Sequence, residues 1–188
     1  MERTLEKGNY KFLFIYEFLG TAMLTWGENV GTSKDPWGPV FNILAIILVV
    51  GPITGAHINP AVTTGILISN RNILVQIPIF LLTVFAQISG AMFGTLLAFT
   101  CLQNKYTATL PNHERGSVPL SEFDFLMPKP GITGFNAFMI EMICTFTLVF
   151  LVLTLHTARL SPSKEGLLGC IGACCLILSI TQVGNRSG

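Results

Sequence analysis

Residues 51–65, GPITGAHINPAVTTG, combine helix-breaking residues with polar side chains directly after the apolar run FNILAIILVV. This stretch holds three glycines, two prolines, a histidine and an asparagine. Asn59 is of a residue type that caps helix N-termini, and Pro60 suits the first helical position, where its missing N–H costs nothing. The pattern predicts a short helix, NPAVTTGILIS, that begins at this pair and is too short to cross a bilayer.

Before that helix we predict a backbone break at Gly51, Pro52 and Gly55. Non-helical backbone at membrane depth is tolerated only where it is buried in protein or lines a watery cavity. A half-helix starting at Asn59 would point unpaired N–H groups and the positive end of its dipole toward the membrane centre. Such an end suits water oxygens or anionic groups and repels cations, which favours an uncharged polar pore. The alternative is an ordinary Asn-Pro turn between two packed helices.

The composition is that of a membrane protein. Of 188 residues, 51% are hydrophobic and only 11% are charged, whereas soluble domains carry about 25% charged residues. The net charge of +1, without a basic patch, argues against nucleic-acid binding. The sequence offers no nucleophile paired with a base, no metal-ligand cluster and no phosphate-binding glycine loop, so we expect neither an enzyme nor a cofactor or metal.

Several stretches are long and apolar enough to cross a bilayer, which takes roughly 20 residues. They predict an all-α membrane protein with five transmembrane helices and one re-entrant half-helix. Gly90 and Gly94 form a pair of small residues four apart, which predicts a close helix contact. The lysines and arginines of the loops favour a cytoplasmic N-terminus. The predicted spans are about 11–31, 38–55, 73–102, 134–158 and 166–183.

The two halves of the chain resemble each other. YEFLGT contains Glu17 and Thr21, and IEMICTF contains Glu141 and Thr145, so each has a carboxylate followed four residues later by threonine. Because an odd number of spans separates these units, the repeats would run in opposite directions, which is typical of transport proteins. We expect one channel domain over 1–188. It would comprise a first repeat at about 11–103, an outer loop at about 103–133 and a partial second repeat at about 134–188.

The stretch TGAHINPAVT resembles the signature SGAHxNPAVT of the aquaporin family, the major intrinsic proteins, and departs from it only at Thr54. The likeness extends to YEFLGTAML, AQISGAMFG and IEMICTF and covers nearly the whole chain. The resemblance implies an aquaporin-like inverted repeat. It also implies a passive channel for water and small neutral solutes such as glycerol in the lipid bilayer, and a homotetramer for a complete version of the chain.

The resemblance also assigns roles to single residues. Asn59 would be the first pore asparagine, with Pro60 and Ala61 shaping the helix start. Glu17 and Glu141 would support the re-entrant loops through hydrogen bonds. The carbonyls of the broken segment would line the pore, which involves Gly55, Ala56, His57 and Ile58.

The family's outer filter falls near Pro39 and Phe41 on the second span, and near Ile180 and Thr181 on the fifth. The second Asn-Pro-Ala motif, the arginine that follows it in the family, the second half-helix and the sixth span are not in the sequence up to Gly188. A chain ending there would lack half of the constriction, so we expect it to conduct water poorly or not at all.

The sequence is also compatible with two other functions. One is a non-conducting partner that joins full-length channels and alters their assembly. The other is an ion-coupled secondary transporter, which would need charged groups at the midplane, where Glu17 and Glu141 are the only candidates. Insensitivity of transport to ion gradients would separate a channel from such a transporter.

Overall fold

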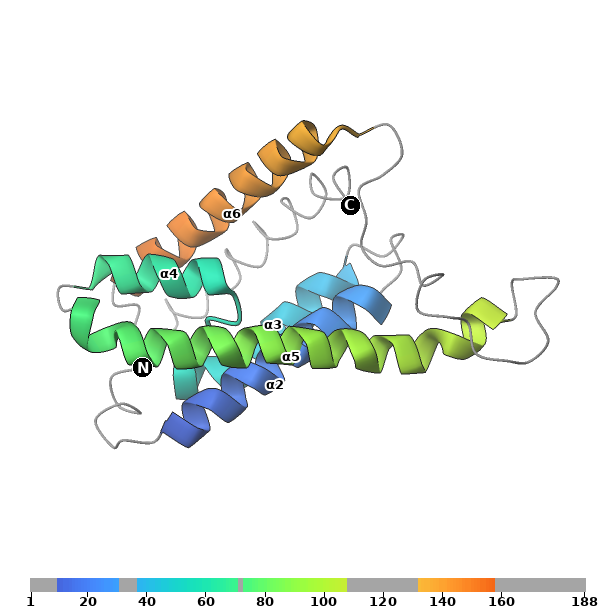
Figure 1. Cartoon of the computed structure of the whole chain (residues 1–188), viewed down its shortest axis with the longest axis horizontal. Coiled ribbons are helices and arrows are strands. Elements are labelled where there is room, and N and C mark those ends of the chain that lie inside the picture. The colour runs from blue at the N-terminus through green and yellow to red at the C-terminus, as the bar shows by residue number, and fades with distance from the viewer. Residues whose placement is uncertain (1–9, 31–36, 71–72, 108–131, 158–188) are drawn as a thin grey trace.

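The computed structural model describes residues 10–30, 37–70, 73–107 and 132–157, and every regular element within these ranges is a helix (Figure 1). The predicted all-α fold is therefore confirmed for this part of the chain, while the predicted span at 166–183 lies outside it. The helices are α2 (Tyr10–Val30), α3 (Trp37–Thr54), α4 (Pro60–Ser69), α5 (Ile73–Thr107) and α6 (Gly134–Thr157).

Three of these helices contain a segment long and apolar enough to cross a membrane: Trp37–Thr54, Ile73–Cys101 and Gly134–Thr154. Helix α2 has 21 residues but is not among them. Helix α4 has ten residues, which at 1.5 Å per residue gives about 15 Å, half of the ~30 Å hydrocarbon core. The expected short helix is thus present, too short to span.

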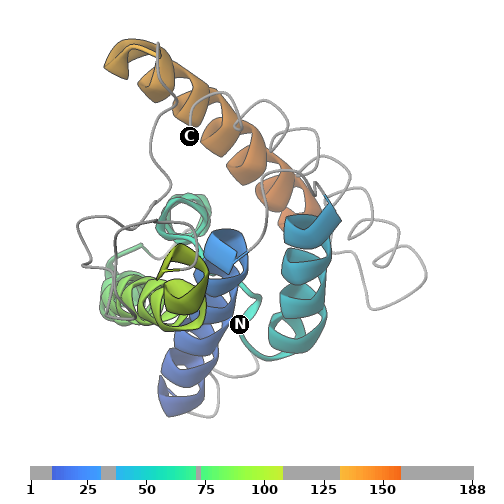
Figure 2. The same cartoon turned by 90° about the vertical axis from the view of Figure 1, so that its right-hand side faces the viewer.

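Among the helices that the structure describes, α2 and α5 pack against each other most extensively, and they lie side by side in Figures 1 and 2. Glycines of α5 allow this approach, because a Cβ on Gly90 would overlap the carbonyl oxygen of Phe18 and one on Gly94 would overlap that of Ala22. Thr25 Oγ1 also donates a hydrogen bond across the pair to the Ala91 carbonyl at 3.2 Å. The predicted close contact at the two glycines is confirmed.

Helices α3 and α4 attach to this pair on different sides. Asn42 Nδ2 of α3 donates to the Met23 carbonyl of α2 at 3.1 Å. Helix α4 packs against α5 and also against α6, where Gly65 approaches Val149 so closely that a Cβ would lie 2.7 Å from its Cγ1. Helix α6 otherwise stands apart from α2 and α5 (Figure 2).

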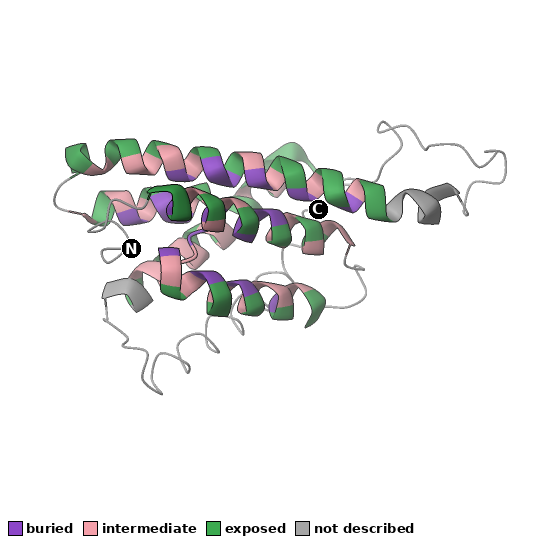
Figure 3. Ribbon diagram, turned by 90° about the horizontal axis from the view of Figure 1, so that it is seen from below, coloured by how far each residue is buried: buried purple, intermediate pink, exposed green. Residues whose placement is uncertain are grey.

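The buried positions lie on the helix sides that face one another (Figure 3). One cluster comprises Ile46 and Val50 of α3 together with Ile58 from the connection to α4. The outward sides expose large apolar residues such as Val49 and Phe85, as expected of surfaces that face lipid. The core is therefore built around the connection between α3 and α4.

The predicted break at Gly51 and Pro52 is wrong, because α3 continues through both residues to Thr54. Proline removes one hydrogen bond from a helix, but its φ is helical, so a last turn can include it. The Gly55 N–H donates to the Gly51 carbonyl at 2.9 Å and closes this turn. The break starts only at Gly55, whose φ is +92°.

Substitution of Gly94 by alanine tests the α2–α5 contact. The added Cβ would overlap backbone of α2, so we expect the free energy of unfolding to fall by about 1–3 kcal/mol. Unfolding in detergent micelles measures the change. Gly134→Ala is the control, since a Cβ there meets no atom within 4 Å. Equal stability of the two variants would contradict the assigned packing.

Candidate functional site

The connection between α3 and α4, residues 55–59, departs from ordinary backbone geometry. Gly55, Ala56 and Ile58 have φ angles of +92°, +47° and +40°. Positive φ is ordinary for glycine, but each non-glycine residue held there costs about 1–3 kcal/mol. Other interactions must therefore hold this connection in place.

The carboxylate of Glu17 on α2 accepts four hydrogen bonds, two of them from backbone amides of this connection. Its Oε1 accepts hydrogen bonds from Thr54 Oγ1 at 2.6 Å and from the His57 N–H at 3.1 Å. Its Oε2 accepts from the Ile58 N–H at 2.8 Å and from Gln87 Nε2 at 2.9 Å. One side chain thus joins α2, the end of α3, the connection and α5.

Glu17 is completely buried, with 0% exposure. A carboxylate taken out of water is costly unless hydrogen-bond donors replace the lost hydration. Here the donors come from two backbone amides, a hydroxyl and a side-chain amide, and hydrogen bonds to a charged acceptor are about twice as strong as neutral ones. The desolvated carboxylate and the strained connection therefore stabilise each other.

A second set of hydrogen bonds links this carboxylate to the start of α4. Gln87 Nε2, which contacts Glu17, also donates to Thr63 Oγ1 at 2.9 Å. Thr63 Oγ1 in turn donates to the Asn59 carbonyl at 3.1 Å. Gln87 and Thr63 are both buried, so this chain of contacts fixes the first turn of α4 against α5.

Asn59 caps α4 as the sequence predicts. Its backbone is extended, with φ −149° and ψ 124°, and its Oδ1 accepts from the Ala61 N–H at 2.8 Å. Pro60 occupies the start of the helix. Since Oδ1 is engaged with the helix start, Nδ2 remains the side chain's donor group.

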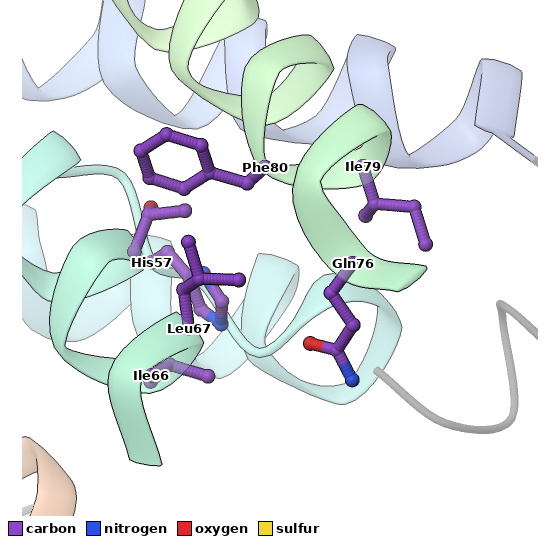
Figure 4. Close-up of a pocket in the computed structure, with 7 residues that line it drawn as sticks. His57, Ile66, Leu67, Gln76, Ile79 and Phe80 are labelled. Atoms are coloured by element: carbon purple, nitrogen blue, oxygen red, sulfur yellow. The ribbon is translucent and has the colours of Figure 1, made fainter. Parts of the chain in front are cut away.

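A small cavity of about 10 Å³ lies between α4 and the first part of α5, with room for roughly one water molecule. His57 contributes to it from the connection, and Figure 4 shows its ring among the lining side chains. His57 is itself only 5% exposed. The remaining lining residues are Thr63, Ile66, Leu67, Gln76, Ile79 and Phe80.

Other predicted site residues lie away from these contacts. Pro39 is partly buried near the start of α3, and Phe41 is 62% exposed. Glu141 is an exposed residue of α6, and the loop that it is expected to support falls outside the described residues. Ile180 and Thr181 also lie outside them.

Two residues that donate hydrogen bonds to Glu17, Gln87 and Thr54, were not identified as site residues from the sequence. Gln87 lies within AQISGAMFG, and an amide in the middle of an apolar span is a signal that could have drawn attention to it. Thr54 was noted only as the departure from the family signature. The structure explains this departure, because threonine keeps the hydroxyl that serine would offer to Glu17.

The sequence pattern of the major intrinsic proteins matches residues 10–187. The chain belongs to this family. The resemblance seen in the sequence is thereby confirmed, and the protein is an integral membrane protein with several membrane-spanning helices. Major intrinsic proteins are channels for water or glycerol and are not enzymes.

Individual proteins are also similar to this chain. Aquaporin AqpM of Methanothermobacter marburgensis is 29% identical over 152 residues, which cover 79% of this chain and 54% of AqpM. Nodulin-26 of Glycine max is 32% identical over 144 residues, or 72% of this chain and 44% of the relative. The aquaglycerol porin AQY3 of Saccharomyces cerevisiae is 30% identical over 166 residues, or 80% of this chain and 25% of the relative. The chain thus spans about half or less of each of these proteins.

Thr63→Val should weaken the site by removing the hydroxyl between Gln87 and the Asn59 carbonyl. Because Gln87 Nε2 would lose a buried acceptor, we expect a loss of about 1–3 kcal/mol in the free energy of unfolding. Thr64→Val is a matched control, since Thr64 is exposed and its hydroxyl donates only within α4, to the Pro60 carbonyl. Denaturation in detergent compares the two variants. An equal loss in both would show that the Thr63 hydroxyl does not link α4 to α5.

Proposed function

We propose that the connection at 55–59 and α4 form one half of a pore for water and small neutral solutes such as glycerol. The observation that carries this proposal is the asparagine-capped start of a half-length helix, held inside the protein by the Glu17 carboxylate. A non-spanning helix with left-handed backbone before it is tolerated at membrane depth only where it is buried in protein or lines a watery cavity. A pore gives this arrangement a function.

Water would meet both donors and acceptors at this helix start. Asn59 Nδ2 would donate a hydrogen bond to the oxygen of a passing molecule, while the carbonyls of residues 55–58 would accept hydrogen bonds from its O–H groups. Left-handed residues interrupt the helical repeat, so these carbonyls are not aligned along a helix axis. Two hydrogen bonds of this kind orient a water molecule and disfavour a proton chain, and the positive helix end repels cations.

Glu17 acts in this proposal as a support and not as a coupling group. Both of its oxygens already accept hydrogen bonds, two each, from other parts of the protein. A carboxylate that binds a transported ion must offer an oxygen to that ion and change partners as it leaves. The fixed and buried contacts of Glu17 therefore favour a passive channel over an ion-coupled transporter.

The relatives support the same solutes, since one carries the name aquaporin and another the name aquaglycerol porin. We further propose that Pro60 and Ala61 shape the helix start and that Glu141 supports the matching loop of a second repeat. Pro39, Phe41, Ile180 and Thr181 remain the predicted filter positions. A homotetramer in the lipid bilayer remains the predicted assembly.

A chimaeric channel tests the half-pore, because the chain spans only part of its relatives. Residues 1–107 of this chain would be joined to the second half of AqpM and reconstituted into lipid vesicles. Light scattering after an osmotic step should show water permeability well above that of empty vesicles, and it should not respond to Na⁺ or proton gradients. AqpM itself is the positive control. A monodisperse chimaera that leaves vesicles as impermeable as empty ones, or that moves solute with an ion gradient, would contradict the proposal.

Asn59→Asp in the same chimaera tests the Nδ2 donor of Asn59 separately from the helix-capping role of its Oδ1. Aspartate keeps an oxygen for the Ala61 N–H but replaces the Nδ2 donor with a second acceptor and a negative charge. We expect unchanged folding, with a loss of water permeability of about tenfold, since one hydrogen bond to a permeant is worth roughly 1 kcal/mol or more. The unsubstituted chimaera is the reference for this comparison. Undiminished water flux in Asn59→Asp would show that Nδ2 does not meet the permeant.

A further inference from the structure

We propose that Ile58 is a positioning residue: its buried side chain, seated over Gly20 of α2, fixes the left-handed backbone that presents Asn59. The effect on permeation rests on the proposed function, but the positioning itself does not. The Ile58 side chain has no direct contact with a solute in this role. It acts through the backbone on either side of it.

The Ile58 side chain is built into the protein core. It is only 6% exposed and forms a cluster with Ile46 and Val50 of α3. Gly20 leaves the space that it occupies, because a Cβ at position 20 would lie 2.9 Å from Ile58 Cγ2. The same Cβ would also stand 3.4 Å from Ile46 Cγ2 and 3.5 Å from Val50 Cγ2. Even one methyl group on Gly20 would therefore displace the Ile58 side chain.

The residue type at position 58 is unexpected for its backbone conformation. A φ of +40° is rare for any residue with a Cβ and strained for a β-branched one. Glycine or asparagine would adopt this conformation at lower cost. The buried side chain supplies the compensating interaction, since it places apolar surface in the core that neither of those residues could place there.

Helix α2 holds Ile58 at two points at once. Glu17 Oε2 accepts the Ile58 N–H at 2.8 Å, and Gly20 accommodates its side chain. Positions three residues apart lie on the same face of a helix, so the Glu17 carboxylate and the space at Gly20 both face Ile58. The amide and the side chain of one residue are thus fixed by one helix face, which determines the direction of the carbonyl between Ile58 and Asn59.

A double-mutant cycle on the full chain in detergent micelles tests this pairing. Gly20→Ala should raise the amide hydrogen-exchange rate of residues 55–59 by about tenfold or more, because the connection opens locally when Ile58 is displaced. Ile58→Ala should itself raise exchange in residues 55–59, because its side chain no longer holds the connection, and it also removes the methyl group that the new Cβ would meet. In the double variant, Gly20→Ala with Ile58→Ala, exchange should therefore be no faster than in Ile58→Ala alone, as expected of residues in direct contact.

Gly51→Ala is the matched control, because a Cβ there lies 3.8 Å from the nearest atom and has room. It should leave exchange in residues 55–59 unchanged. If Gly20→Ala does not alter exchange, or if the two substitutions combine additively, the proposal is overturned. If Gly20→Ala does not fold, a folded double variant supports the pairing and an unfolded one refutes it. Exchange requires no solute flux, so failure of this test is distinct from failure of the chimaeric channel to conduct.

Discussion

The buried carboxylate of Glu17 is the interaction on which the rest of this structure depends. It lies on α2, and its four hydrogen bonds reach the end of α3, the connection before α4, and α5. Without these donors the carboxylate would be desolvated at high cost, and without the carboxylate two backbone amides of the connection would lose their acceptor. The helices therefore pack around the buried Glu17 carboxylate and the strained connection at 55–59, and each stabilises the other.

This constraint explains features that are otherwise unrelated. Glycines at positions 90 and 94 bring α5 close to α2, and this approach is what allows Gln87 to reach Glu17. Gly20 makes room on the same face of α2 for Ile58, whose amide the carboxylate holds. The half-helix α4 then begins at a defined place, with Asn59 at its cap. In the proposed pore, such a fixed helix start would present the same donor to each passing water molecule.

The sequence indicates much of this arrangement but not its geometry. The capped helix at Asn59 and Pro60 follows from local preferences, and the close α2–α5 contact follows from the spacing of two glycines. The start of the break does not follow in this way, because a proline near a helix end is compatible with both outcomes. Here the Gly55 N–H closes a last helical turn on the Gly51 carbonyl. The contacts of Gln87 and the left-handed Ile58 depend on residues up to 70 positions apart, which no local pattern encodes. The resemblance points to Glu17 as a loop support, whereas its individual donors emerge only from the packed helices.

Nuclear magnetic resonance of the ¹⁵N-labelled chain in micelles tests the central role of Glu17 most directly. The amide protons of His57 and Ile58 should resonate downfield and exchange slowly, because both donate to a buried carboxylate. In Glu17→Gln both resonances should move upfield and exchange faster, while the amides beyond the first turn of α4 should remain in place. If the two amides keep their shifts and their protection in Glu17→Gln, the carboxylate does not hold the connection, and its central role in the fold is refuted.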